Sequence, residues 1–298
     1  NAQKRTPAQL VSTPAAKMAE TLNVTLLAHH QVQSLDTAAQ TAIVTHNGHT
    51  QTLRYRQLVL ATGAHPIRIP VAGSAADQVK SINNLDDFAA FHQALGLDPN
   101  AAAQTTPTTV VIMGAGLIGC EFANDLVQAG VTVHVVDPSP RPLTLLLPAD
   151  ASEQLQTALQ AQGVVWHFGT TVTAVDEAGN GVRVQLADGS GVEAQMVLSA
   201  IGLRADTALA AAAGLTCERG IVVDDMLQTS APGVYALGDC AQYASAGQRT
   251  LPYVMPIMNA AKALAATLAG TPTPVVFPLM PVSIKTPALP IVVAAPHP

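Results

Sequence analysis

Hydrophobic and polar positions follow one another along this chain in the order that alternating strands and helices require. The clearest segment runs from Thr109 to Asp137, where an apolar run rich in β-branched residues precedes a glycine loop and a helical pattern. The apolar run, Val110–Met113, predicts a buried strand, and the helical pattern ends at Gly130. A second apolar run then ends on an acidic residue. This order predicts a strand–helix–strand unit with parallel strands.

Three glycines with the spacing GxGxxG join the first strand to the helix. Gly114 permits a tight turn, Gly116 lets the backbone approach a pyrophosphate, and Gly119 lets the helix pack closely on the strand. The helix N-terminus offers free N–H groups and a positive dipole end to phosphates. Asp137 is placed to accept hydrogen bonds from an adenosine ribose and to repel a 2′-phosphate. The pattern therefore predicts a dinucleotide site that prefers NAD to NADP, with a purely structural turn as the alternative.

A weak helical pattern and a series of strands precede this unit. The helical pattern covers Leu10–Leu22, and Asn47-Gly48 predicts a tight turn between two strands. The strands are expected at Val24–Ala28, Gln31–Asp36, Thr41–His46, Leu53–Arg56 and Leu58–Gly63.

A second series of the same kind follows the unit. Asp150 and Glu153 have the spacing of a capping box, for a helix that ends near Gln162. Asp188-Gly189 predicts another tight turn. Strands are expected at Val164–Phe168, Thr171–Asp176 and Val197–Gly202.

The two series match at an offset of 140 residues, which pairs Val32 with Val172 and Asp36 with Asp176. Gly63 matches Gly202 within one residue of the same offset. We infer an internal duplication of a whole dinucleotide-binding domain. The partner of Gly114 would then lie before the first residue. Either the first glycine fingerprint never existed, or the sequence is a fragment that lacks its N-terminal strand–helix–strand. We expect the fragment, because a sheet without its first strands would expose unpaired edges.

The remaining segments connect and follow the two series. A linker-like region holds Pro66–Pro70, a helical pattern at Leu85–Leu97 and a polar stretch that reaches Thr109. After the second series, a strand at Val234–Leu237 ends in Gly-Asp, and a helix is expected at about Ile257–Leu268. The Gly-Asp pair suits an ordinary turn, but beside a duplicated nucleotide domain we expect the aspartate to face a ligand.

Composition narrows the class of function. A length of 298 residues suggests two domains, and a net charge of −6 without a basic block argues against binding nucleic acid or anionic membranes. The uncharged stretch Ala263–Ile284 carries four prolines and is not expected to span a membrane. No signal peptide is evident, so we expect a cytoplasmic protein.

The cysteines and histidines predict no metal site. Cys120, Cys217 and Cys240 form no CxxC pair, which argues against a disulfide framework, a cysteine metal site or a dithiol centre in this chain. His134 and His167 fall within strand patterns, where we expect core or rim imidazoles.

Several runs of residues resemble the flavoprotein reductases with two dinucleotide domains, the FAD-dependent pyridine nucleotide oxidoreductases. The resemblance covers nearly the whole chain and rests on LATG at 60–63, GAGLIGCEFA at 114–123 and TSAPGVYALGDC at 229–240, in that order. Further runs resemble the branch of this family that reduces rubredoxin: YRQLVL at 55–60, CEFANDL at 120–126, YVMP at 253–256 and KTPA at 285–288.

The resemblance implies an α/β fold with two duplicated Rossmann-like domains. The FAD domain is discontinuous, at 1–104 and 222–276, and lacks its N-terminal part. The NAD domain, 105–221, is inserted between these two pieces. A C-terminal α/β interface domain begins at 277 and is truncated at 298.

The resemblance also implies roles for individual residues. Glu121 faces the flavin and nicotinamide rings and pairs with a lysine of the missing N-terminal segment. Lys285 lies near the flavin pyrimidine, as does the positive end of the helix after Pro256, and both stabilise an anionic reduced flavin. Asp239 binds the ribityl chain. The other cofactor contacts implied are Val32, Thr62, Gly63 and Val254 for FAD, and Gly114, Gly116, Leu117, Ile118, Gly119, Asp137 and Gly202 for NAD.

The activity implied is that of an NADH oxidoreductase. A hydride passes from NADH to FAD, and single electrons pass on to a small iron protein. The acceptor expected is rubredoxin in the electron chain of alkane hydroxylation, with a ferredoxin as the alternative. A second hypothesis is a nucleotide-binding module that binds NAD and no flavin. A yellow purified protein would support the enzyme and a colourless one the module, and for the chain as given we expect the colourless result.

Overall fold

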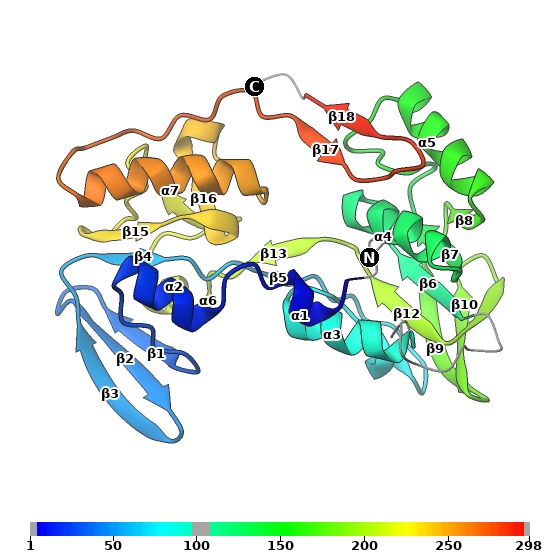
Figure 1. Ribbon diagram of the computed structural model, residues 1–298, viewed down its shortest axis with the longest axis horizontal. Helices are drawn as coiled ribbons and strands as arrows, with labels where there is room; N and C mark the ends of the chain where they lie inside the picture. Colours follow the sequence, from blue (N-terminus) through cyan, green and yellow to red (C-terminus); the bar gives the residue numbers. More distant parts are fainter. Residues whose placement is uncertain (1–4, 97–107, 295–298) are drawn as a thin grey trace. The chain divides into compact units, whose positions relative to one another are not determined.

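The computed structural model describes residues 5–96 and 108–294, which form two compact units. Helices and strands alternate in both units (Figure 1), which confirms the predicted α/β class. No helix in the described ranges is long and apolar enough to cross a membrane. The end of the helical pattern at Leu97 and most of the polar stretch after it lie outside the described residues. The first unit comprises Asn1–Ser12, Pro66–Gly202 and Pro281–Ala295, and the second Thr13–His65, Leu203–Met280 and Pro296–Pro298.

A parallel four-stranded sheet forms the centre of the first unit. Its strands lie in the order β12-β6-β7-β8, and every neighbouring pair is parallel. Four of the five residues of β6 are buried, because both faces of the sheet are covered, and this explains its continuous apolar run. The strands are β6 Thr109–Met113, β7 Thr132–Asp137, β8 Val164–Phe168 and β12 Met196–Ser199.

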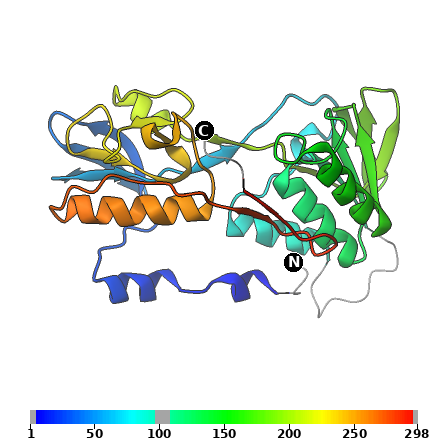
Figure 2. The ribbon, with the colours of Figure 1, turned by 90° about the horizontal axis from the view of Figure 1, so that it is seen from above.

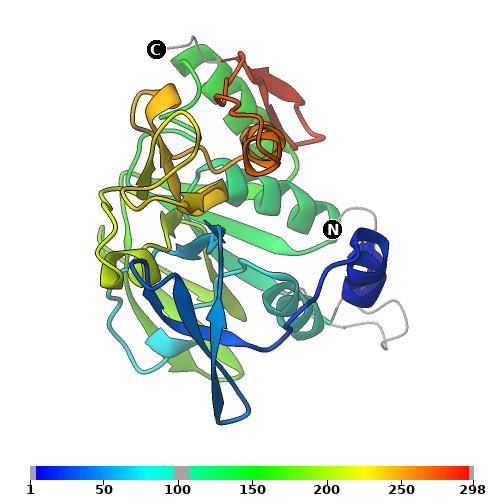
Figure 3. The ribbon, with the colours of Figure 1, turned by 90° about the vertical axis from the view of Figure 1, so that its left-hand side faces the viewer.

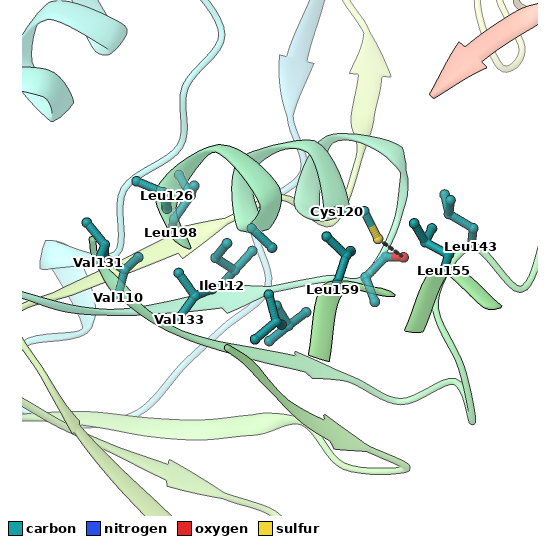
Figure 4. Packing of buried hydrophobic residues seen from close by; sticks show 14 of the residues in the cluster. Val110, Ile112, Cys120, Leu126, Val131, Val133, Leu143, Leu155, Leu159 and Leu198 are labelled. Carbon is teal, nitrogen blue, oxygen red and sulfur yellow. Dashed lines mark hydrogen bonds between the residues drawn. The ribbon is translucent and has the colours of Figure 1, made fainter. Parts of the chain in front are cut away.

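Helices cover one face of this sheet. Val110 and Ile112 of β6 pack in one core with Leu126 of α4 and Leu159 of α5 (Figure 4). A hairpin from the end of the chain adds Ile284 to the same core. The elements on this side are α1 Pro7–Leu10, α3 Leu85–Ala94, α4 Leu117–Gln128, α5 Ala149–Ala161, β17 Val282–Ile284 and β18 Ile291–Val293.

An antiparallel meander covers the other face. The side chains of Val111 and Met113 point away from the helices and pack with Val175 and Val184 of the meander. The linker-like region is tied to the same layer, because the Ala72 N–H donates to the Thr173 carbonyl at 3.0 Å. The elements are η1 Ala76–Gln78, β9 Val172–Ala178, β10 Gly181–Leu186 and β11 Gly191–Ala194.

Two histidines lie at the rim of the parallel sheet. The rings of His134 and His167 stack with centroids 5.3 Å apart, and Nδ1 of the first lies 3.0 Å from Nε2 of the second. Both side chains are half-buried, and burial lowers the pKa of His134. They are rim imidazoles, as the strand patterns indicated.

The second unit repeats the meander and adds short parallel pairs. Strand β4 pairs with β15, and β14 pairs with β16, all in parallel. Helix α7, drawn in orange in Figure 2, packs Ala260 and Leu264 onto these strands. The elements are α2 Ala15–Leu22, β1 Gln31–Asp36, β2 Thr41–His46, β3 His49–Arg54, β4 Leu58–Leu60, β5 Ala64–Pro66, β13 Leu203–Ala205, α6 Ala208–Ala212, β14 Ile221–Val223, β15 Val234–Ala236, η2 Gly238–Cys240, β16 Ala241–Tyr243, η3 Ala244–Ala246 and α7 Val254–Leu268.

The structure contains the duplicated pattern that the sequence predicted. The central strands of the two meanders, β2 at Thr41–His46 and β10 at Gly181–Leu186, are offset by 140 residues at both ends. Each meander runs antiparallel through three strands, and each is followed by a strand that pairs in parallel with its neighbour.

Several local predictions differ from the structure. The helical pattern at Leu10–Leu22 forms two helices, α1 and α2, and the strand expected at Leu53–Arg56 is observed as β3, His49–Arg54. Val24–Ala28 forms no strand; its apolar side chains are exposed and no described strand pairs with it. The helix expected to start with a capping box begins at Ala149 with Pro148 as N-cap, which leaves Asp150 inside the first turn. Helix α7 begins at Val254, so Pro256 lies in its first turn, where a missing N–H costs nothing.

Candidate functional site

The glycine loop follows β6 and turns tightly. Gly114 has a φ of +102°, which favours glycine, and a Cβ there would lie 2.7 Å from the Ala200 carbonyl oxygen. Its N–H donates to the Val136 carbonyl at 2.8 Å, so the loop starts against the end of β7. This position fits the turn that the sequence assigned to Gly114.

The other two glycines have opposite surroundings. A Cβ on Gly119 would lie 2.0 Å from the Gly114 carbonyl oxygen, so only glycine lets the helix pack on the loop. A Cβ on Gly116 would meet no described atom within 4 Å. The backbone at Gly116 therefore faces open space, which a bound group can approach.

The N-terminus of α4 carries an uncompensated positive end. Gly116 is the N-cap and provides no side-chain acceptor, and the first turn holds no acidic residue. The backbone N–H groups of Leu117, Ile118 and Gly119 precede the first intrahelical donor, Cys120. Ile118 is about half exposed. These N–H groups and the helix dipole suit an anion such as a pyrophosphate.

Asp137 binds the glycine loop itself. Its Oδ2 accepts from the Ala115 N–H at 2.6 Å, and its Oδ1 accepts from the Ser139 N–H at 2.7 Å. Each carboxylate oxygen keeps a second lone pair, so the half-buried group can still accept a ribose hydroxyl. The ribose contact stays a prediction, and bracing the loop is an additional role that the sequence did not indicate.

Cys120 closes the inner side of the loop. Its thiol donates to the Ala115 carbonyl, with Sγ 3.4 Å from the oxygen (Figure 4). Burial, with Asp137 and Glu121 nearby, raises the pKa of Cys120 to about 12. The side chain is therefore a neutral thiol with a packing role.

The two predicted catalytic residues meet in the first unit. Glu121 is the fifth residue of α4, and its Oε1 accepts from the backbone N–H of Lys285 at 2.8 Å. Lys285 directly follows β17 and is exposed. The contact holds the lysine through its backbone and leaves its ammonium group free to point elsewhere.

Gly202 also lies in the first unit, three residues after the end of β12. Its φ is +109°, and its carbonyl accepts from the Ile67 N–H at 3.0 Å. It follows Ala200, whose carbonyl crowds Gly114, by two residues.

Asp239 has a buried oxygen without a partner. Its Oδ1 accepts no hydrogen bond from the described part of the chain, and burial raises the pKa of the carboxyl group. The preceding Gly238 is fixed by Tyr243, whose hydroxyl accepts from the Gly238 N–H at 2.8 Å. A buried acceptor of this kind calls for a donor such as a ligand hydroxyl. Sequence reasoning missed Tyr243, for which no motif gave a signal.

Helix α7 contacts η2, the element that contains this aspartate, and its N-terminus is uncapped. Tyr253 is the N-cap without a side-chain hydrogen bond, and the first turn holds no acidic residue. Val254, the first residue of the helix, is 73% exposed. A negatively charged group would be stabilised at this end of the helix.

The remaining predicted FAD contacts have separate positions in the second unit. Thr62 donates its hydroxyl to the Asp206 carbonyl at 2.7 Å, and the Gly63 carbonyl accepts from the Asp206 N–H at 2.9 Å. Val32 lies on β1 and is 40% exposed. Sequence reasoning missed Asp206. The match of Gly63 with Gly202 was a signal, because the segments that follow these two glycines pair as β5 and β13.

Comparison with known proteins agrees with this arrangement. The family model described as pyridine nucleotide-disulphide oxidoreductase matches residues 2–266. A rubredoxin-NAD(+) reductase of Alcanivorax borkumensis is 46% identical over 95% of this chain and 70% of its own length. A nitric oxide reductase FlRd-NAD(+) reductase of Aeromonas salmonicida is 42% identical over 97% of this chain and 70% of its own length. The crystal structure of a covalent putidaredoxin reductase–putidaredoxin complex gives a TM-score of 0.82 at 26% identity, over 94% of this chain and 67% of the other.

Proposed function

The chain belongs to the pyridine nucleotide-disulphide oxidoreductase family, and we propose that it passes electrons from NADH through FAD to a small one-electron iron protein. The acceptor that we propose is a rubredoxin. The observation that carries the proposal is the glycine loop with its open Gly116 and uncapped helix, in a chain 46% identical to a rubredoxin-NAD(+) reductase.

The residues of the first unit fit NADH. The N–H groups at the start of α4 face open space at Gly116, where a Cβ would meet no described atom within 4 Å. Asp137 stands at the end of the adjacent strand with lone pairs left for a ribose, and its charge opposes a 2′-phosphate. These residues bind and orient the dinucleotide.

The residues of the second unit fit FAD. The unpartnered Oδ1 of Asp239 suits a ribityl hydroxyl, and the uncapped end of α7 suits a negative charge on the flavin ring. Bound FAD would supply the chemistry that side chains lack, since it takes up a hydride and gives out single electrons. The protein's own part is to position both cofactors and to stabilise charge.

We further assign the finer roles that the sequence suggested. Glu121 and Lys285 act beside the flavin, and Val32, Thr62, Gly63 and Val254 line the FAD site. Leu117, Ile118, Gly119 and Gly202 line the NAD site, with Gly114 and Gly116 shaping its loop. The FAD domain is 1–104 with 222–276, the NAD domain 105–221, and a C-terminal domain begins at 277. The protein acts in the cytoplasm, in an electron chain for alkane hydroxylation.

The test is NADH-dependent reduction of rubredoxin by the flavin-loaded protein, followed at the visible absorbance of the iron centre. A ferredoxin serves as the competing acceptor, and the Gly116→Ala variant is the matched control, since it should keep the fold and bind NADH more weakly. Reduction of ferredoxin without reduction of rubredoxin would refute the acceptor. A flavin-loaded protein that binds NADH without reduction of its flavin would refute the enzyme.

A further inference from the structure

The hairpin formed by β17 and β18 is fastened to helix α4 at two points. Glu121 Oε1 accepts from the Lys285 N–H at 2.8 Å, and Asn124 Oδ1 accepts from the Ala288 N–H at 3.1 Å. Because Glu121 and Asn124 are three residues apart, they lie on one face of the helix. Figures 1 and 3 show the hairpin (red) beside the green helices.

Two side chains at this loop are buried, and the loop is internally braced. Ile284 and Thr286 are each 1% exposed. The Thr286 hydroxyl donates to the Leu289 carbonyl at 2.9 Å, and the Thr286 N–H donates to the Ile284 carbonyl at 2.9 Å. The loop that carries Lys285 is therefore held in one conformation against α4.

Asn124 is an unusual residue at its position. It is fully buried on a helix face whose neighbours, Ala123 and Leu126, belong to the apolar core. A buried amide is costly unless it is hydrogen-bonded. Here its oxygen accepts from the Ala288 N–H, and its Nδ2 lies 3.4 Å from Asp125 Oδ1. The contact with the hairpin loop therefore accounts for an asparagine where an apolar residue would otherwise pack.

We propose that Asn124 is a positioning residue which, with Glu121, fixes Lys285 at a set distance from the glycine loop. Both acceptors stand on the helix whose N-terminus is the proposed dinucleotide site. At about 1.5 Å per residue, Glu121 lies about 6 Å along the axis from Leu117. One rigid helix thus sets the spacing between the NADH site and the lysine. We call the two hydrogen bonds from Glu121 and Asn124 to the hairpin loop the clamp. The role of the lysine rests on the proposed function, whereas the clamp does not.

Amide hydrogen exchange tests the clamp directly. In the wild type, the Ala288 amide should exchange slowly. Asn124→Leu, which removes the acceptor and keeps the number of side-chain heavy atoms, should speed that exchange about tenfold. Asn124→Asp, which keeps an acceptor oxygen, should not speed it at a pH at which the buried carboxyl group is protonated. The control is Gln128→Leu, because Gln128 is an exposed residue of the same helix. Fast exchange of Ala288 in the wild type, or unchanged exchange in Asn124→Leu, would overturn the clamp.

A double-mutant cycle on the flavin-loaded protein tests the positioning role. Lys285→Met should lower kcat for NADH oxidation in the wild type and have little further effect in Asn124→Leu, whose KM for NADH should stay within about twofold. Equal fold losses in both backgrounds would overturn the positioning role. If Ala288 exchange is fast in Asn124→Leu but the wild type does not oxidise NADH, the proposed function is refuted and the clamp is not.

Discussion

Gly119 and Gly116 provide a matched pair of substitutions that separates packing from binding. Both belong to the GxGxxG loop, and both become alanine. A Cβ on Gly119 would lie 2.0 Å from the Gly114 carbonyl oxygen, a contact with backbone that no side-chain rotation can relieve. A Cβ on Gly116 would meet no described atom within 4 Å. The first change should therefore act on stability and the second on NADH binding.

The size of each effect follows from these contacts. To bring the Gly119 contact to 3.0 Å, helix and loop must separate by about 1 Å, for which overpacking costs about 3 kcal/mol. Removing glycine from a helix returns about 1 kcal/mol, so the net loss is about 2 kcal/mol, or about 4 to 8 °C in Tm for a domain of this size. At Gly116 the φ of −74° suits alanine. There the poorer N-cap, about 0.5 kcal/mol, is offset by a similar loss of unfolded-state entropy.

Thermal unfolding by circular dichroism and NADH titration by fluorescence measure the two effects. Gly119→Ala should unfold several degrees below the wild type. Gly116→Ala should keep its Tm within about 2 °C and bind NADH about tenfold more weakly, because the methyl group occupies the space for the pyrophosphate. A Gly119→Ala variant as stable as the wild type would refute the packing argument. Unchanged NADH affinity in Gly116→Ala would refute the proposed site.

Three further predictions address charge and reactivity. Asp137→Ala should lower the preference for NADH over NADPH in paired kcat/KM measurements; unchanged selectivity would show that Asp137 does not read the ribose. Burial raises the pKa of Asp239, so the native state holds a proton that the unfolded chain has lost, and stability falls as pH rises through the native pKa. Asp239→Asn should thus raise the Tm of flavin-free protein at pH 7, with the gain vanishing below about pH 4; an equal Tm at pH 7 would contradict this. Burial raises the pKa of Cys120 to about 12, so at pH 8 a thiol reagent should label the less buried Cys217 and spare Cys120, and mass spectrometry of labelled peptides would reveal the opposite.

Short-range chemistry explains which parts of the fold could be predicted. The bounds of β1 and β2 agree with the predicted Gln31–Asp36 and Thr41–His46, and the β-branched residues of β2 and the tight turn that follows it act locally. Val24–Ala28 has a similar apolar composition but no partner strand among the described residues, and propensity alone does not form a strand. The start of α5 was missed because proline at the N-cap carries no capping signal.

The candidate site divides in the same way. The glycine loop was predictable because each glycine has a steric reason that acts within a few residues. The contact of Glu121 with Lys285 joins residues 164 positions apart, and only the family resemblance placed both near the flavin. Asn124 gave no sign in the sequence, since its partner is a backbone N–H, which every residue but proline possesses.

The pairing of β4 with β15 sets an order for folding during synthesis. Leu58 of β4 pairs with Val234 of β15, and the whole of β6 to β12 lies between them in the chain. A ribosome adds about 5 to 20 residues per second, so β4 waits on the order of ten seconds or more for its partner. In that time the parallel sheet of the first unit can already form. The pairing of β4 with β15 therefore follows the parallel sheet of the first unit, and the edge of β4 stays unpaired in the nascent chain until then.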